Sequence, residues 1–385
     1  MHQKKIFFPN LDGIRFFCFL SVFLFHTWSL LYAGINSNGF GSRLFENGNL
    51  GVNFFFVLSG FLITYLLIAE KNVTGRINIP KFWMRRILRI WPLYFLCVLL
   101  GFVIIPFALK IAGRPEFPTA SPIAYLTFTS NFDYIKNGYP GSTILEVLWS
   151  IAVEEQFYFF WPLLLAIVPR RYYLLLFSLI VTGSLIFRFI YHDQQMHNIH
   201  TFSCIGDMAV GAIGAWASFS EKFTAFFQRL RKTDILLIYL IALAFFFFRA
   251  QLFYHGVFLQ AIDRLLIAVV FLLIILEQNY AAGSLFKFSR YKRISQLGII
   301  SYGLYCYHEL AITAVFVSFS FLVSVDNLFL SSIKVILSLA ATIAIAMISY
   351  WFFETPFLNL KKKYSLFVQG GSTTKKEISE KKILL

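Results

Sequence analysis

The sequence predicts an all-α membrane protein, a polytopic transmembrane helix bundle of about ten spans. Three observations lead to this fold class. Apolar residues make up 58% of the 385 residues, and 48 of these are phenylalanines, which suit packing between helices and against lipid. Many apolar runs carry no charge, whereas a helix of a soluble protein would show a polar face. Basic residues gather in the connections between these runs, as they do in membrane proteins.

The predicted spans follow one another along the chain. Most hold the roughly 20 mostly apolar residues that a bilayer crossing needs. The runs at 204–219 and 235–249 are short, and the first of them contains Asp207. In chain order, the predicted spans are 14–33, 50–69, 90–109, 147–168, 172–191, 204–219, 235–249, 257–276, 297–321 and 328–353.

The charges predict the orientation of the bundle. Lysine and arginine are in excess on the cytoplasmic side of a membrane, and here every second connection is rich in them: Lys4–Lys5, Lys71–Arg89, Arg170–Arg171, Lys222–Lys232, Lys287–Arg293 and Lys361–Lys363. We therefore expect both termini in the cytoplasm. Residues 1–367 form one predicted membrane domain, and the polar residues 368–385 a disordered cytoplasmic tail. The proline-rich connection 110–146 is expected to fold over the outer face.

Composition also excludes several classes of protein. The net charge of +15 reflects orientation in the membrane and gives no signal for nucleic-acid binding, because no exposed basic domain is visible. The four cysteines lie in or beside apolar runs and are predicted as core residues without disulfides. No His, Cys or Asp cluster has the spacing of a zinc site, so no metal is expected. The first span lacks a small-residue cleavage site, which argues against a signal peptide.

Arg15 and His26 are the first candidate functional residues. Both lie in the span IRFFCFLSVFLFHTWSLLY, where an ionisable side chain is costly and marks a functional site by default. Eleven helical residues return to nearly the same face, ~16 Å further along the axis. His26 alone could instead reach toward the interface. Asp12, just before this span, could cap the helix or act with Arg15.

Three arginines gather at the start of the third span, in RRILRIWP. Arg85, Arg86 and Arg89 are spaced so that their guanidinium groups lie near one another on a helix. Arginine forks suit phosphate oxygens, which favours a phosphate ligand. Anchoring to anionic lipid is the commoner explanation of such a cluster, and composition alone favours it.

Glu154 and Glu155 lie inside the fourth span, in LWSIAVEEQFYFFWP. Two adjacent carboxyl groups in a membrane must be neutralised, paired or hydrated. Because they point about 100° apart, one can face the stripe of His26 while the other holds a neighbouring helix. Asn53, on the second span, is expected near the depth of His26, and its amide needs partners there. Gly51, Ser59 and Gly60 are predicted to allow close helix packing.

The ninth span contains Tyr302, Tyr305 and His308, in SYGLYCYHEL. Tyrosine is common at membrane interfaces, so these two tyrosines are weak evidence by themselves. His308 is equally compatible with a ligand contact and with a hydrogen bond between helices. Glu354, in FFETPF, could simply mark the end of a helix.

In their order along the chain, these segments resemble the acyltransferase 3 family of integral membrane O-acyltransferases. LDGIRFFCFLSVFLFH matches the opening span of the family, with Arg15 and His26 in its R-x10-H pattern. GVNFFFVLSGFLI, RRILRIWPLYF, LWSIAVEEQFYFFWP, SYGLYCYHEL and FFETPF resemble the later signatures. The resemblance covers about residues 9–357. Asn53 departs from it, because many members have Asp at that position.

The resemblance implies an enzyme that transfers an acyl group, usually acetyl, from cytosolic acyl-CoA to a hydroxyl group. Family acceptors are mostly sugars of lipopolysaccharide, exopolysaccharide or peptidoglycan, so a carbohydrate or lipid-linked acceptor in the cell envelope is expected. Some members carry an extracytoplasmic hydrolase-like domain; none is recognised here, so the chain is expected to act alone or to pass its acyl group to a separate transferase. The expected location is the inner membrane of a bacterium.

A mechanism follows from the residues and the resemblance together. His26 would act as general base, with its tautomer fixed by Glu154 or Glu155. Arg15 would orient the donor or steady charge on the thioester oxygen. The expected CoA contacts are Arg85, Arg86, Arg89, Tyr302, Tyr305 and His308.

The alternative function is a secondary transporter or flippase for an anionic or sugar-lipid substrate, because buried His, Glu and Arg also build proton relays. The chain shows no paired repeats of the kind common in transporters, which counts against this alternative. A purely structural membrane scaffold ranks last, because it leaves the adjacent glutamates unexplained.

Overall fold

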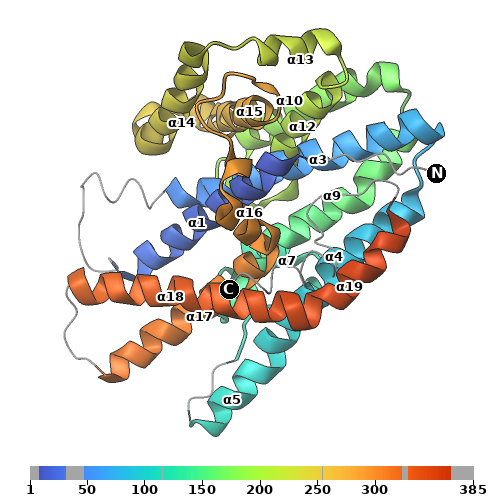
Figure 1. Ribbon diagram of the computed structural model, residues 1–385. Helices are drawn as coiled ribbons and strands as arrows, with labels where there is room; N and C mark the ends of the chain where they lie inside the picture. Colours follow the sequence, from blue (N-terminus) through green and yellow to red (C-terminus); the bar gives the residue numbers. More distant parts are fainter. Residues whose placement is uncertain (1–7, 32–46, 114–116, 254, 323–327, 366–385) are drawn as a thin grey trace, which may run out of the picture.

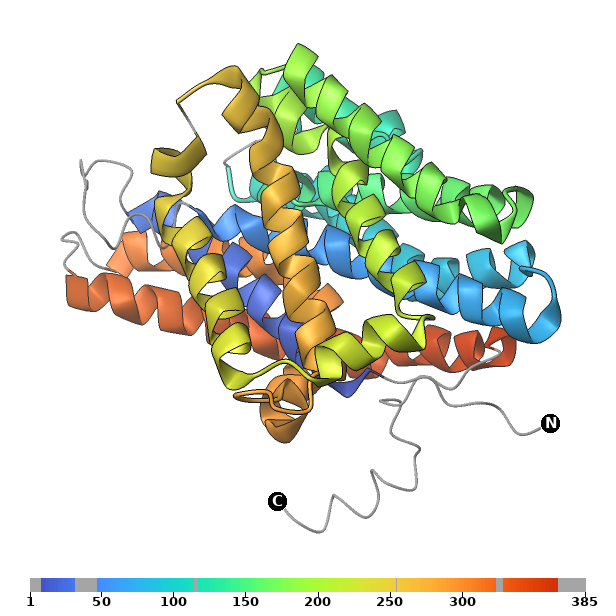
Figure 2. The same ribbon diagram turned by 90° about the horizontal axis from the view of Figure 1, so that it is seen from above.

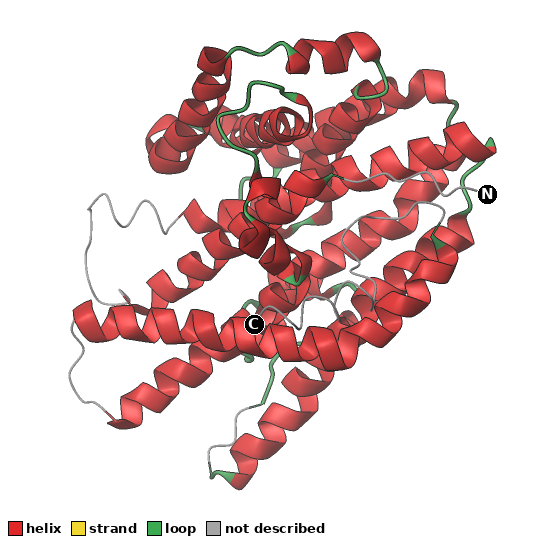
Figure 3. Ribbon diagram, viewed as in Figure 1, coloured by secondary structure: helices red, strands yellow, loops and turns green. Residues whose placement is uncertain are grey.

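The computed structural model describes residues 8–31, 47–113, 117–253, 255–322 and 328–365, and in these residues all regular elements are helices (Figures 1 and 3). All ten predicted spans fall on helices, whereas the predicted disordered tail lies outside the described residues. The α-helices are α1 (Pro9–Leu31), α3 (Leu50–Thr74), α4 (Ile79–Leu99), α5 (Ile105–Ile111), α6 (Pro122–Leu126), α7 (Ser130–Asn137), α8 (Thr143–Glu146), α9 (Leu148–Ile167), α10 (Tyr173–Ile190), α11 (Gln194–Ile199), α12 (Thr201–Ala217), α13 (Glu221–Gln228), α14 (Lys232–Phe253), α15 (Val257–Tyr280), α16 (Lys292–Ile299), α17 (Ser301–Leu322), α18 (Leu328–Ser349) and α19 (Thr355–Lys361).

Fewer helices than ten qualify as membrane spans by length and composition. Six are long and apolar enough, or eight when each of two bent helix pairs counts as one span, among the described residues. The bends lie between α12 and α13 (99°) and between α16 and α17 (76°). These helices make the chain an integral membrane protein, while the count of ten spans and the cytoplasmic termini stay predictions.

The turn between α3 and α4 positions the arginine cluster. Gly75 ends α3 with φ of +77°, a conformation that glycine adopts without strain. Asn78 then caps α4 by accepting the backbone N–H of Lys81 at 3.1 Å. Glu70, one turn before the end of α3, accepts the backbone N–H of Asn78 at 3.0 Å. The two helices are therefore locked together where the arginines begin.

Close packing of α3 confirms the role predicted for two of its glycines. A Cβ atom at Gly60 would lie 2.0 Å from the carbonyl oxygen of Met208 on α12, and one at Gly51 would lie 2.3 Å from that of Cys18 on α1. Gly211 on α12 returns the contact, since its Cβ would lie 2.1 Å from the Val57 oxygen. Only residues without a side chain allow the backbones to approach this closely.

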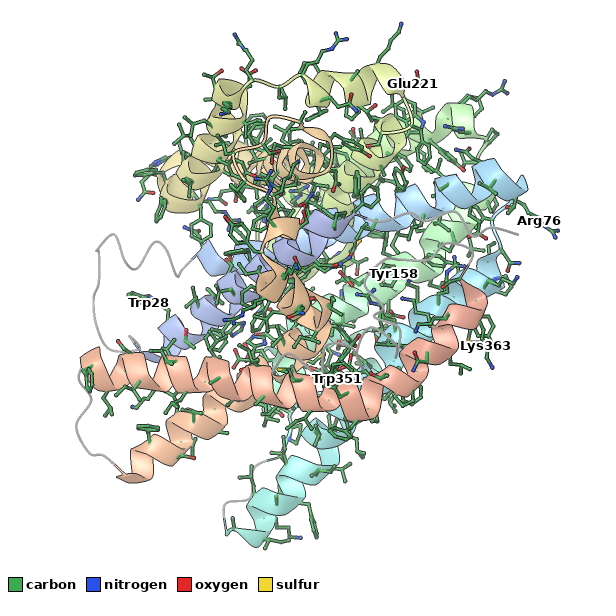
Figure 4. The ribbon with its side chains drawn as sticks, in the orientation of Figure 1. Trp28, Arg76, Tyr158, Glu221, Trp351 and Lys363 are labelled. Carbon is green, nitrogen blue, oxygen red and sulfur yellow. The ribbon has the colours of Figure 1, made fainter. Side chains whose placement is uncertain are left out.

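The central position in the bundle belongs to α1 and α3. Seen from above, they lie between α17–α18 on one side and α10–α12 on the other (Figure 2). Three labelled residues mark two opposite sides of the molecule: Arg76 and Lys363 lie at one side, and Trp28 lies toward the other (Figure 4). The last turns of α1, which carry Trp28, are therefore far from the turn between α3 and α4.

The connection 110–146 packs against the bundle through short helices, α6 to α8. The Gln156 amide of α9 donates to the Phe128 carbonyl at 2.8 Å and to the Asn131 side chain at 2.9 Å. The Tyr94 hydroxyl of α4 donates to the Tyr125 carbonyl at 2.8 Å. Side chains buried in the helix bundle thus fix this connection, whose last residue, Glu146, is placed beside α17.

Candidate active site

A cavity with an open volume of about 120 Å³ lies between α1, α3, α4, α9 and α17, and apolar side chains form much of its wall. Guanidinium groups line one part of it: Arg15, Arg86 and Arg89. Hydroxyl and carboxyl groups also line it: Ser59, Ser150, Glu154, Tyr158, Ser301, Tyr302 and Tyr305. A concentration of positive charge in a cavity with apolar walls attracts an anionic ligand.

The predicted arginine cluster divides into two groups. Arg86 is 8% exposed, lines the cavity and lies over the ring of Tyr158 at 5.7 Å, while its Nε atom has no hydrogen-bond partner among the described residues. Arg89 also lines the cavity. Arg85 does not: it pairs with Glu70 at 3.1 Å and donates to the Tyr364 carbonyl at 2.9 Å. Arg86 and Arg89 are therefore the members available to a ligand in the cavity.

Arg15 reaches the same cavity from α1, where it pairs with Asp12. Asp12 lies in the first turn of α1, and its carboxylate accepts a hydrogen bond from the guanidinium group of Arg15. Arg15, Arg86 and Arg89 come from two helices that are far apart in sequence. Their convergence is the part of the predicted site that the structure brings together.

Glu154 and Glu155 have separate surroundings. Glu154 faces the cavity and accepts hydrogen bonds from Ser59 and from Tyr158, both at 2.8 Å. Glu155 accepts the indole N–H of Trp91 on α4, also at 2.8 Å. One glutamate thus belongs to the cavity and the other ties α9 to α4.

His26 is oriented by a carboxylate that we did not predict. Its Nδ1 atom contacts Oε1 of Glu309 on α17, and its ring lies 5.1 Å from that of His308, between centroids. The prediction that Glu154 or Glu155 fixes the tautomer of His26 is wrong, because these two groups bind Ser59, Tyr158 and Trp91 instead. The physical reason is that α17 packs against α1, whereas α9 packs against α3, α4 and α12.

The three residues His26, His308 and Glu309 form a compact cluster. Their ligand atoms all lie within 4.8 Å of one another, and together they are a donor set that could hold a metal ion. The sequence predicted no such set because the three residues lie on two spans without a zinc-like spacing. His308 and Glu309 are buried, at 0% and 4% exposure.

A pair of hydroxyl groups separates the cavity from this cluster. The hydroxyl groups of Ser150 and Tyr305 lie 2.7 Å apart, and both residues line the cavity. The ring of Tyr305 lies 5.6 Å from that of His308, which in turn reaches His26. His26 and His308 do not line the cavity themselves. Tyr302 lines it and donates to the Ile90 carbonyl at 2.9 Å.

The connection 110–146 adds a further carboxyl group near the cluster. Glu146, at the end of α8, is hydrogen-bonded by Tyr134, and burial raises the pKa of its carboxyl group above the usual range. Burial, together with the charge and the hydrogen bond of Glu146, raises the pKa of Tyr134 to about 12. The charges of His26 and Glu309 both act on Glu146. This connection therefore contributes to the surroundings of His26.

The chain matches the acyltransferase domain that defines the acyltransferase 3 family over residues 8–351. The chain belongs to the acyltransferase 3 family. This membership confirms the resemblance read from the ordered motifs and the class of enzyme that it implies, an O-acyltransferase. It gives no support to the transporter alternative.

Curated relatives of this acyltransferase 3 chain are longer proteins. It is 31% identical over 396 residues to O-acetyltransferase OatA of Staphylococcus aureus (strain MRSA252), covering 94% of the chain and 60% of the relative. It is 25% identical over 377 residues to peptidoglycan O-acetyltransferase OatA of Listeria monocytogenes, covering 92% and 56%. The chain thus spans about three fifths of the length of these relatives. No solved structure matches it.

Sequence analysis did not assign three residues of the candidate site to their roles. Glu309 directly follows His308, but its contact with His26 depends on the packing of α1 against α17, which the sequence does not reveal. Ser59 was predicted as a packing residue, but its hydroxyl binds Glu154. Tyr158, one helical turn after Glu154, was predictable from spacing as a partner of that carboxylate.

Asn53 belongs to a different polar network of the acyltransferase 3 bundle. Its amide donates to Asp207 at 3.2 Å, and Arg264 donates to the same carboxylate at 2.8 Å. The buried ion pair joins α12 to α15, and the hydrogen bond from Asn53 adds α3 to the network. The short span 204–219 thereby neutralises its aspartate, which explains why an acidic residue is tolerated there.

Proposed function

We propose that this protein transfers an acetyl group from cytosolic acetyl-CoA to a hydroxyl group of a cell-envelope carbohydrate, in the inner membrane of a bacterium. The observation that carries the proposal is that two polar sites lie next to each other. An arginine-lined cavity reaches Tyr305, whose ring lies 5.6 Å from that of His308. The ring of His308 lies 5.1 Å from that of His26, and Nδ1 of His26 contacts the Glu309 carboxylate. The names of the relatives, both O-acetyltransferases, support the choice of acetyl and of an envelope acceptor.

The donor half of the proposal rests on the cavity arginines. Arg86 and Arg89 would bind phosphate oxygens of CoA by charge-assisted hydrogen bonds. Arg15 would hold the donor as well, because ~16 Å of helix separates it from the reacting centre at His26. The flexible pantetheine arm would pass Tyr302 and the Ser150–Tyr305 pair to bring its thioester toward His26.

The chemical step rests on the tautomer of His26. With its hydrogen on Nδ1, donated to Glu309, the imidazole keeps a lone pair on Nε2. Nε2 removes the proton of the acceptor hydroxyl as the oxygen attacks the thioester carbonyl. The carbon–sulfur bond then breaks, and the proton passes from His26 to the leaving thiolate. Glu309 stabilises the imidazolium that exists between these two transfers.

The acceptor half of the proposal rests on the connection 110–146. The hydroxyl group would reach His26 from the outer side, past the connection that carries Tyr134 and Glu146. Because the curated relatives extend well beyond the matched region, a separate extracytoplasmic transferase is a second possible recipient of the acetyl group. The experiment below should therefore measure acetylation of the acceptor both in the presence and in the absence of an extracytoplasmic transferase.

The experiment uses the purified full chain in lipid vesicles, acetyl-CoA and soluble peptidoglycan fragments, with acetyl ester formation measured by mass spectrometry. Replacing His26 with Ala should lower the rate roughly 10²-fold or more, the usual contribution of a general base. His192→Ala is the matched control, because His192 is an exposed histidine outside the cavity. A His26→Ala protein that forms ester or releases CoA at the wild-type rate would contradict the proposal.

A further inference from the structure

We infer that His26, His308 and Glu309 form a binding site for Zn²⁺ or a similar transition-metal ion, and that an ion bound there switches off the acyl-transfer step. Two histidines and a carboxylate are a ligand set that zinc accepts with its remaining position open. The ligand atoms of the three residues already lie within 4.8 Å of one another. The metal-binding part is independent of the proposed function, whereas the inhibitory part rests on it.

The state of His308 is the observation that points to a ligand. Its Nδ1 atom lies 2.6 Å from the carbonyl oxygen of Tyr305. A carbonyl can only accept, so the hydrogen is on Nδ1 and the lone pair is on Nε2. That Nε2 atom is fully buried and has no hydrogen-bond partner in the part of the chain that the structure describes. An unpaired buried acceptor is costly, and a metal ion would satisfy it.

The same bond gives His308 the outer partner typical of a metal ligand. Histidines that bind metal usually donate their second N–H to a carbonyl or carboxylate, which fixes the ring. Here Nδ1–H of His308 donates to the Tyr305 carbonyl, and this bond directs Nε2 toward Glu309, whose Oε1 lies 3.9 Å away. A small rotation of side chains would bring both atoms into a common coordination sphere.

The local charge also favours a cation. Glu309 contributes a carboxylate to the cluster, and Glu146 lies near enough for its charge to interact with those of His26 and Glu309. Imidazole nitrogens select zinc, copper or nickel over magnesium and calcium, which prefer oxygen ligands. The site is therefore expected to bind Zn²⁺ and Co²⁺ and to ignore Mg²⁺.

Inhibition follows from the tautomer of His26. The nitrogen that contacts Glu309 is Nδ1, so this is the atom that would bind the ion. A neutral imidazole bound through Nδ1 carries its hydrogen on Nε2. In the proposed mechanism Nε2 must accept a proton, and in the metal-bound form it has no lone pair left to do so. Metal and catalytic proton transfer are therefore mutually exclusive.

The binding experiment uses the purified full chain without a histidine tag and without acetyl-CoA or acceptor. Zn²⁺ is titrated against a competing zinc indicator, and Co²⁺ is added separately to record its visible absorption spectrum. We expect one ion per chain, and an affinity at least tenfold weaker in His308→Ala and His308→Gln. His192→Ala, which removes an exposed histidine elsewhere, should bind as the wild type does.

Thermal unfolding without metal shows whether each variant is folded, and His308→Gln provides a second, less disruptive change. Equal zinc affinity in the wild type and in a folded His308 variant would overturn the site. The inhibition experiment measures acetyl ester formation by the wild type, rather than thiol release, because zinc binds thiols. Zn²⁺ should stop the reaction and a chelator should restore it.

Three outcomes distinguish the metal site, its inhibitory role and the proposed function. Ion binding in a protein with no transferase activity would leave the metal site standing and remove the proposed function. Full activity with the ion bound would remove the inhibitory role. Transferase activity without any specific ion binding would remove the metal site and leave the proposed function intact.

Discussion

The carboxylate that contacts Nδ1 of the histidine on α1 is central to the proposed mechanism. Glu309 contacts Nδ1 of His26, while Glu154 belongs to the cavity with Ser59 and Tyr158. A carboxylate at Nδ1 orients the ring and stabilises its charged form. In the proposed mechanism Glu309 is therefore a positioning residue, and Glu154 organises the wall of the cavity proposed to bind the donor.

Replacing Glu309 with Gln should lower kcat roughly 10²-fold or more and leave the KM for acetyl-CoA unchanged, because the amide can donate to Nδ1 and so favour the wrong tautomer. The measurement is steady-state ester formation at several acetyl-CoA concentrations. Glu277→Gln is the matched control, since Glu277 is a fully buried glutamate on α15 that binds Tyr239. An unchanged kcat in Glu309→Gln would exclude this role.

The arginines make a second prediction at this scale. Arg86→Ala and Arg89→Ala should each raise the KM for acetyl-CoA about tenfold, since each removes a charged hydrogen bond to a phosphate. Arg85→Ala should change KM much less and instead lower the thermal stability, because it leaves Glu70 buried without its ion pair. If all three variants bind CoA normally, the arginines anchor lipid and do not hold the donor.

Sequence reasoning identified ionisable residues better than their partners. A charge inside an apolar run is visible without a structure, so Arg15, His26 and Glu154 could be found. Which two side chains meet depends on how distant helices pack, and helical spacing within one span carries no such information. Adjacent residues Glu154 and Glu155 looked equivalent from the sequence, yet they contact different helices.

Among the helices, α3 is the most constrained. Gly51 meets α1, Gly60 meets α12, and the hydroxyl of Ser59 between them holds Glu154 on α9. These small residues were recognised in the sequence because glycine and serine are the residues that allow helices to approach. Their partners, Met208 and Cys18, were not predictable, since a backbone carbonyl has no sequence signature.

Replacing Gly60 with Ala should destabilise the protein by about 1–3 kcal/mol, because the added methyl group meets the Met208 carbonyl on a neighbouring helix. Thermal or denaturant unfolding in detergent measures the change. Gly183→Ala is the control: nothing lies within 4 Å of the added atom, and alanine favours a helix. Equal stability of the two variants would mean that α3 and α12 do not pack as described.

At the scale of the whole molecule, the sequence predicted the helices and their order. Apolar runs are local features, so all ten predicted segments are found on helices. The number of crossings was harder, because α9 and α14 are helices of 20 and 22 residues that stand outside both the six spans and the bent pairs. In α9, the polar residues Glu154 to Gln156 contact other helices. A helix of this kind can be polar in part, so the apolarity of its sequence does not show whether it crosses the membrane.

The predicted orientation can be tested with single cysteines at two exposed lysines. Lys136→Cys, on the outer connection, should react with a membrane-impermeant maleimide added to intact cells, and Lys81→Cys only after permeabilisation. The native cysteines are all buried, so their background should be low. Labelling with the opposite pattern would reverse the orientation and place the arginine cavity on the wrong side for cytosolic CoA.

The glycine contacts between α3 and α12 have a mechanical consequence. Two helices whose backbones are in contact cannot slide or rotate against each other without steric clashes. We therefore expect α3 and α12 to move as one rigid unit. The wall formed by α9 and α17 is joined differently, through the hydroxyl groups of Ser150 and Tyr305, 2.7 Å apart. A passage for substrate is therefore expected to open by separation of α17 from α9, with α3 and α12 staying in place.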